Sequence, residues 1–280
     1  MFMRSTKPFS SSDDVALKIY GERNTGTNYL AALADLNLQA QVLPGRVDDG
    51  DLRTIFTRRL RRFMPGLTHR LHETARDRFF EATFARNLGW KHMNPDPERI
   101  GPEALASVRF LMLVKNPYAW LLSLFQRPYH VGAQDSDLER FLTRRLPVME
   151  QRENLGPRPL LPAEVWNRKM RGYARLQQAA THAVIARYED FLADEAATLA
   201  RVAADLGIAK RDRHVPVSEG VKREDGTVSH RTYADYYLRE CWREKLGPAT
   251  LDIINETLDP EIVSLMGYEM ITPDMLSGAT

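Results

Sequence analysis

A glycine-bounded turn near the N-terminus, residues 21–26 (Gly-Glu-Arg-Asn-Thr-Gly), is the stretch of this sequence best suited to hold a phosphate. The apolar run 15–20 before it predicts a strand, and the apolar residues after Thr27 have helical spacing. Glycines let the backbone come close to a ligand, and the N–H groups at a helix start favour an anion. The pattern predicts a phosphate cradle, with an ordinary strand-to-helix turn as the alternative.

The spacing Gly21-x-x-x-x-Gly26 matches only half of the loop found in nucleotide triphosphatases. Thr27 stands where that motif has its lysine, and Asn28 stands where it has the hydroxyl that binds magnesium. A triphosphate would lose its charge clamp and its metal anchor here. The loop is therefore better suited to a phosphate that is held but not hydrolysed.

A second cationic site is predicted from Lys115 and Ser123. Lys115 follows the apolar run 108–114, which predicts a buried strand, and ligands of open α/β sheets bind at the carboxyl ends of strands. Asn116 and Pro117 suit a helix cap and a first helical residue, so Ser123 lies two turns into the next helix. If that helix packs beside the strand, the cation and the hydroxyl reach one phosphate. A solvated lysine and a small packing serine are the alternatives.

His92 is the candidate general base. It ends the run 89–93, which predicts a short strand, and a histidine at a strand end near a phosphate loop suits proton transfer. A surface or capped histidine is the alternative. Glu22 and Glu189 are further candidates for acid–base work, and for Glu189 a structural role at a strand end is the stronger interpretation.

The order of the elements predicts an α/β fold. Strands at 15–20, 108–114 and 183–187 alternate with helices, which implies a mostly parallel central sheet covered on both faces. Residues 52–86 form a basic stretch that Pro65-Gly66 divides into two helices. These are either a solvated helix pair or a basic wall over an acidic ligand. Residues 209–235 are polar and predict a long surface loop.

Composition limits the classes of function. The 39 lysines and arginines nearly balance the 37 aspartates and glutamates, which argues against broad nucleic-acid coating. The single cysteine, Cys241, excludes an internal disulfide and a cysteine metal cluster. No apolar run is long enough to span a membrane, so a cytoplasmic protein is expected. Residues 1–14 predict a flexible tail.

Together the motifs resemble those of the sulfotransferases that use 3′-phosphoadenosine 5′-phosphosulfate (PAPS). Residues 23–27 are similar to the family's 5′-phosphosulfate loop. Lys115-Asn116-Pro117 with Ser123, eight residues after the lysine, is similar to its 3′-phosphate site, and Lys91-His92 to its Lys-x-His base region. Residues 187–194 resemble its Arg-Tyr-Glu-Asp-Leu stretch, and residues 242–269 its closing helices.

The resemblance implies a P-loop-like sulfotransferase architecture, a three-layer αβα single domain over residues 15–280. It implies transfer of a sulfuryl group from PAPS to a hydroxyl or amine without a metal. His92 would be the base, and Arg23 and Lys91 would stabilise the leaving phosphate. The residues expected to hold PAPS are Arg23, Asn24, Thr25, Gly26, Thr27, Asn28, Lys115, Ser123, Lys222 and Arg223.

The acceptor is expected to be a glycan or a small hydroxylated metabolite, and segments 44–88 and 127–165 would shape its site. The sequence departs from the family in four places. Asn24 stands where the family has a basic residue, Lys115 replaces an arginine, and the Lys-x-His region is contracted. The family's glycine-rich Arg-Lys-Gly segment has only Lys222-Arg223 as a substitute. A P-loop kinase or triphosphatase, and a non-catalytic nucleotide- or glycan-binding protein on the same fold, are the alternatives.

Overall fold

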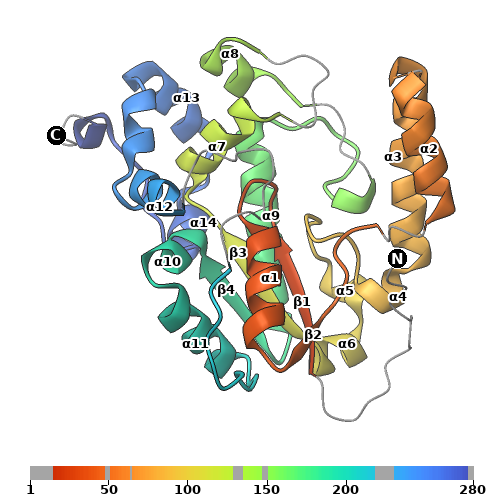
Figure 1. Ribbon diagram of the computed structural model, residues 1–280. Coiled ribbons are helices and arrows are strands. Elements are labelled where there is room, and N and C mark those ends of the chain that lie inside the picture. The colour runs from red at the N-terminus through yellow and green to blue at the C-terminus, as the bar shows by residue number, and fades with distance from the viewer. Residues whose placement is uncertain are drawn as a thin grey trace.

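The computed structural model of the protein describes residues 15–47, 51–63, 65–128, 135–146, 151–217 and 230–276. Within them, a four-stranded parallel sheet has the order β2-β1-β3-β4 (Figure 1). Its strands are β1 (Val15–Gly21), β2 (Ala40–Val42), β3 (Arg109–Val114) and β4 (Ala183–Arg187). The predicted strands at 15–20, 108–114 and 183–187 are confirmed, and β2 was not predicted.

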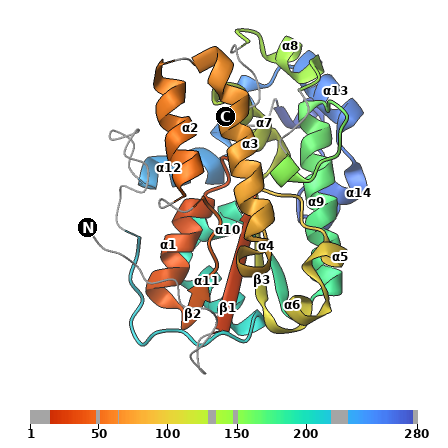
Figure 2. The ribbon, with the colours of Figure 1, turned by 90° about the vertical axis from the view of Figure 1, so that its right-hand side faces the viewer.

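Helices cover both faces of the sheet, as the sequence predicted. Leu17 and Leu111 face α1 (Thr27–Asn37) and α11 (Glu195–Asp205) in one core. Alternate strand residues such as Tyr20 and Met112 join a second core with α7 (Pro117–Gln126) and α9 (Pro162–Ala179). Figure 2 shows the sheet between α1 and α9. The three-layer α/β fold is therefore confirmed.

The remaining helices surround this centre. They are α2 (Leu52–Phe63), α3 (Pro65–Ala82), α4 (Phe84–Asn87), α5 (Pro97–Ile100), α6 (Pro102–Ser107), α8 (Leu138–Thr143), α10 (Tyr188–Ala193), α12 (His230–Leu238), α13 (Pro248–Thr257) and α14 (Pro260–Leu265). Short 3₁₀ turns lie at Gln151–Glu153, Cys241–Lys245 and Pro273–Leu276. No helix among the described residues combines the length and the apolar character needed to cross a membrane.

Asn116 starts α7 as predicted. Its side chain accepts hydrogen bonds from the backbone N–H groups of Tyr118 and Ala119 at 3.0 and 3.4 Å. Pro117 occupies the first helical position, where a missing N–H costs nothing. The helix that carries Ser123 is thereby held at the carboxyl end of β3.

Two predicted elements were wrong. Residues 89–93 form turns rather than a strand. Leu88 and Gly89 both have positive φ, at 53° and 84°, which no strand allows. The expected surface loop at 209–235 ends early, because α12 begins at His230. The expected tail at 1–14 lies outside the described residues.

Lys18 explains why residues 87–89 turn. Its side chain is fully buried, and its Nζ donates to the carbonyls of Asn87 and Gly89, both at 2.5 Å, and of Pro44 at 3.3 Å. The ammonium therefore binds β1 to the segment that leads into Trp90 and His92. Burial lowers the pKa of Lys18 to about 7.

This lowered pKa predicts how the stability of the protein depends on pH. Between about pH 7 and 10.5 the unfolded chain binds more protons at Lys18 than the folded chain does, so the free energy of unfolding should rise with pH. Lys18→Met should reduce the slope by up to about 1.4 kcal/mol per pH unit. Urea unfolding at pH 7 and pH 9 measures this. The exposed Lys210→Met is the control, and an unchanged slope in Lys18→Met would contradict the prediction.

Candidate functional site

The predicted phosphate cradle has the expected backbone. Gly21 ends β1, and Asn24 and Gly26 have positive φ, at 63° and 85°. Thr27 begins α1, and its N-cap Gly26 supplies no capping side chain. The first N–H groups of a helix have no partner within the helix, so the start of α1 remains available to an anion.

The side chains of the cradle mostly hold the cradle itself together. Thr25 Oγ1 donates to the Glu22 carbonyl at 2.5 Å, and the Arg23 N–H donates to Glu22 Oε1 at 2.6 Å. Thr25 and Thr27 are buried. Of the predicted donor-binding residues in this loop, Gly26 and Thr27 form the junction with α1, and Asn28 lies in the first turn of that helix.

Gly26 cannot be replaced without strain. A Cβ there would lie 2.8 Å from Cε2 of Tyr188, at a φ that side chains rarely adopt. Gly26→Ala should therefore destabilise the fold by about 1–2 kcal/mol for the left-handed backbone and by a further 1–3 kcal/mol for the clash. Gly207→Ala is a matched control, because φ is +62° there and nothing lies within 4 Å. Urea unfolding compares the two variants, and equal losses would contradict the clash.

Lys91 reaches the start of α1 from another segment. Its Nζ donates to Asn28 Oδ1 in the first turn of that helix. Burial, and then the charge of Arg46, lower the pKa of Lys91 to about 7. The loop that lacks its own lysine is thus supplied with an ammonium group by residue 91.

His92 lies beside the end of β1 with a defined tautomer. Its Nδ1 is 2.6 Å from the Gly21 carbonyl, which can only accept, so Nδ1 carries the proton and Nε2 keeps its lone pair. Its ring packs edge-on against Trp90 with centroids 4.9 Å apart. Burial first, and then the charge of Lys91, lower the pKa of His92 well below its usual 6.5. The imidazole is therefore neutral near pH 7, as a base must be.

Lys115 and Ser123 meet as the eight-residue spacing predicted. Lys115 Nζ donates to Ser123 Oγ at 3.0 Å and to the Asn24 carbonyl at 3.4 Å. A residue not predicted from the sequence completes the group. The hydroxyl of Tyr237, from α12, accepts from Lys115 Nζ at 2.6 Å. Lys115 is only 1% exposed, and burial lowers its pKa to about 7.

The side chain of Arg23 is engaged within the protein. Its guanidinium forms a 3.0 Å ion pair with the buried Glu153 and lies 4.6 Å from the Trp90 ring centre. The Arg23 carbonyl accepts from Trp120 Nε1 at 3.0 Å. These contacts fix the loop between α7 and the segment that carries Lys91 and His92.

Lys169 is a second residue that sequence reasoning missed. It is fully buried in α9, and its Nζ donates to the His92 carbonyl at 2.6 Å. The same ammonium pairs with Glu153 at 3.1 Å and with Glu22. Lys169 therefore connects the cradle, the candidate base and the 151–153 turn. No local spacing could reveal a group whose members lie so far apart in sequence.

The two carboxylates that were further candidates for acid–base work are both engaged by other residues. Glu22 is 1% exposed and pairs with Lys169. Glu189 accepts from the Asn116 N–H at 3.0 Å and from the Tyr268 hydroxyl at 2.8 Å. Lys222 and Arg223 lie outside the described residues. Within the described residues, no group of three or more histidine, cysteine, aspartate or glutamate side chains is arranged to hold a metal.

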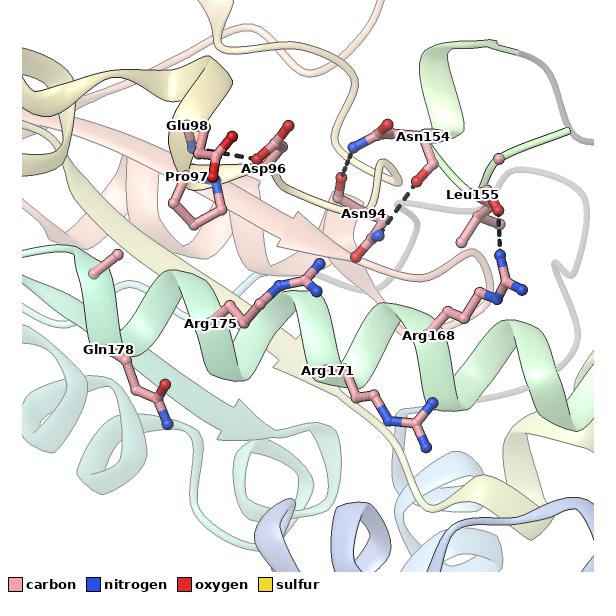
Figure 3. Close-up of a pocket in the computed structure, with 12 residues that line it drawn as sticks. Asn94, Asp96, Pro97, Glu98, Asn154, Leu155, Arg168, Arg171, Arg175 and Gln178 are labelled. Carbon is pink, nitrogen blue, oxygen red and sulfur yellow. Dashed lines mark hydrogen bonds between the residues drawn. The ribbon is translucent and has the colours of Figure 1, made fainter.

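A separate groove lies along the outer side of α9. It encloses about 870 Å³ between α9 and residues 94–98 (Figure 3). Arg168 and Arg171 on its wall are engaged by the Leu155 carbonyl and by Asp259. None of the predicted site residues that the structure describes lines this groove. We therefore assign the candidate site to the carboxyl edge of the sheet.

Comparison with known proteins gives matches among solved structures alone. No family model matches the sequence, and no curated protein matches it. A sulfotransferase domain from the curacin biosynthetic pathway is 14% identical with a TM-score of 0.40, over 94% of this chain and 100% of that one. A sulfotransferase domain from the olefin synthase of Synechococcus PCC 7002 is 13% identical with a TM-score of 0.42, over 90% of this chain and 98% of that one.

Proposed function

We propose that the protein is a sulfotransferase that moves a sulfuryl group from PAPS to a hydroxyl or amine. One observation carries the proposal. Two lysines reach the same cradle from outside it, Lys91 at Asn28 and Lys115 at Asn24. A ligand with two separated phosphates fits two such cationic positions, because ammonium groups bind phosphate oxygens through charge-assisted hydrogen bonds. PAPS has this arrangement, whereas ATP carries its phosphates in one chain.

In the proposed complex, the start of α1 and Lys91 hold the 5′-phosphosulfate, and Lys115 with Ser123 holds the 3′-phosphate. PAPS supplies an activated sulfuryl group. The acceptor oxygen or nitrogen forms a bond to sulfur while the bond from sulfur to the phosphate oxygen breaks. The electron pair leaves with that oxygen, beside Lys91. His92 Nε2 takes the acceptor proton.

Arg23 has a positioning role in this proposal. Its ion pair with Glu153 and its contact with Trp90 keep the loop beside His92. The acceptor would enter next to segments 44–88 and 127–165, whose described parts contain exposed arginines such as Arg46 and Arg144. These arginines suit an anionic glycan, and a small hydroxylated metabolite is compatible with the same segments.

Thermal stabilisation by 3′-phosphoadenosine 5′-phosphate (PAP), against ADP and magnesium-ATP, tests the donor site. Saturation at about a hundred times the dissociation constant should stabilise the fold by about 2.7 kcal/mol. A shift with PAP alone supports the proposal. A shift only with magnesium-ATP would overturn it in favour of a P-loop kinase or triphosphatase.

A non-catalytic binding protein is the second candidate, and Tyr237 favours it. Its hydroxyl occupies the contact on Lys115 that a phosphate oxygen would need. PAP binding without PAP release from PAPS, across a panel of hydroxyl and amine acceptors, would select this candidate. Release of PAP with labelled sulfate on an acceptor would exclude it.

A further inference from the structure

The α2–α3 helix pair carries an apolar face that is turned to solvent. Leu52 is 78% exposed and Phe56 is 64% exposed. They lie one turn apart, so they share one face of α2. Leu71 on α3 is 55% exposed as well. Figure 1 shows the two helices side by side at one edge of the molecule.

The helices pack on each other through small polar residues instead. Thr54 lies on the side of α2 opposite Leu52 and Phe56, and it is buried. Thr57 Oγ1 lies 3.1 Å from Nδ1 of His72 on α3, and Thr68 of α3 is buried too. An amphipathic helix normally turns its apolar side to the protein core. α2 turns its apolar side to solvent instead, which indicates that an apolar surface outside this chain covers that side.

The positive charge around the apolar side of α2 indicates which kind of surface covers it. Residues 52–72 contain six arginines and no aspartate or glutamate. Arg59 shares the face of Leu52 and Phe56, and the exposed Arg53 and Arg58 flank it. A second copy of the chain would bring arginines against arginines, which repel. The pattern of an apolar stripe bordered by arginines is that of a helix lying at an anionic lipid surface.

We propose that α2 binds the protein peripherally to membranes rich in anionic lipid. Leu52 and Phe56 enter the boundary between headgroups and acyl chains, and Arg53, Arg58 and Arg59 contact lipid phosphates and carboxylates. This binding uses no residue of the proposed donor site, so it can be tested separately from donor binding.

Vesicle flotation of the full chain tests the proposal. Vesicles of phosphatidylcholine alone are compared with vesicles containing 30% phosphatidylserine, each in low and high salt. We expect binding to the anionic vesicles in low salt, much weaker binding in high salt, and little binding to phosphatidylcholine. Absence of binding to the anionic vesicles would overturn the proposal.

Two variants and their matched controls separate the contributions. Arg53→Gln/Arg58→Gln/Arg59→Gln should weaken partition about fivefold for each arginine removed, and about a hundredfold in total. Arg211→Gln/Arg213→Gln/Arg239→Gln removes the same charge from exposed positions elsewhere and should bind like wild type.

Leu52→Ser/Phe56→Ser should weaken binding about tenfold or more, and the exposed pair Leu36→Ser/Leu265→Ser should not. Circular dichroism checks that each variant is folded. Equal losses in α2 variants and controls would contradict the assignment to α2. A dimer that Leu52→Ser/Phe56→Ser abolishes, without vesicle binding in wild type, would assign the face to a second copy instead.

Discussion

His92→Ala is expected to lower turnover by about a hundredfold to ten-thousandfold, the range for loss of a general base. The affinity for PAP should stay close to that of wild type, because the proposed phosphate contacts come from other residues. The described hydrogen bond of His92 is to the Gly21 carbonyl. PAP release with an acceptor identified by screening measures turnover, and calorimetry measures the affinity. The exposed His69→Ala is the control. Full turnover in His92→Ala would contradict its role as base.

The pH profile gives an independent readout of the same residue. Because burial holds the pKa of His92 well below 6.5, the acidic limb of kcat/KM should lie below that value. Lys91 must be protonated to stabilise the leaving group, and its pKa is about 7, so activity should fall as pH rises through about 7. With PAPS held at saturation, Lys91→Arg keeps the charge at high pH and should move the alkaline limb upward.

Lys115→Met is expected to weaken PAP binding by about 10- to 150-fold, corresponding to about 1.5–3 kcal/mol for a charge-assisted hydrogen bond. The variant keeps an unbranched side chain of nearly the same length and removes its charge. Calorimetric titration with PAP measures the loss. Lys210→Met, at an exposed position, should bind PAP normally. Unchanged affinity in Lys115→Met would contradict the assignment of the 3′-phosphate.

Proton uptake on PAP binding distinguishes the loss of the Lys115 ammonium from a general loss of fold in Lys115→Met. With a pKa of about 7, Lys115 is mostly neutral at pH 8 in the free protein and must take up a proton to hold a phosphate. PAP affinity should therefore fall as pH rises through 7. Calorimetry at pH 8 in buffers of different ionisation enthalpy should report greater proton uptake in wild type than in Lys115→Met.

The sequence predicted those parts of the site that neighbouring residues determine. The contact of Lys115 with Ser123 was predicted from their spacing of eight residues, which spans the end of a strand and the start of a helix. The structure confirms this contact at 3.0 Å. The Gly21–Gly26 turn and the cap at Asn116 followed from local backbone chemistry in the same way. Parallel strands at 15–20, 108–114 and 183–187 followed from apolar runs.

The missed parts depend on contacts between distant residues. Tyr237 contacts Lys115 across 122 residues, and Lys169 contacts His92 across 77 residues. No local sequence pattern relates residues that far apart. β2 has three residues, too few for a periodic signal. The predicted strand at 89–93 was wrong because buried Lys18 binds the carbonyls of Asn87 and Gly89 and fixes a turn.

The packing of Trp90 against His92 makes the candidate base observable by fluorescence. The Trp90 indole is 4% exposed, and the rings meet edge-on at 4.9 Å. A protonated imidazole at such a distance quenches indole emission, whereas a neutral imidazole does so weakly. Quenching of tryptophan emission in acid that is present in wild type and missing in His92→Ala would report the charge of His92 as light intensity. The charge of the base could then be followed without any knowledge of the acceptor.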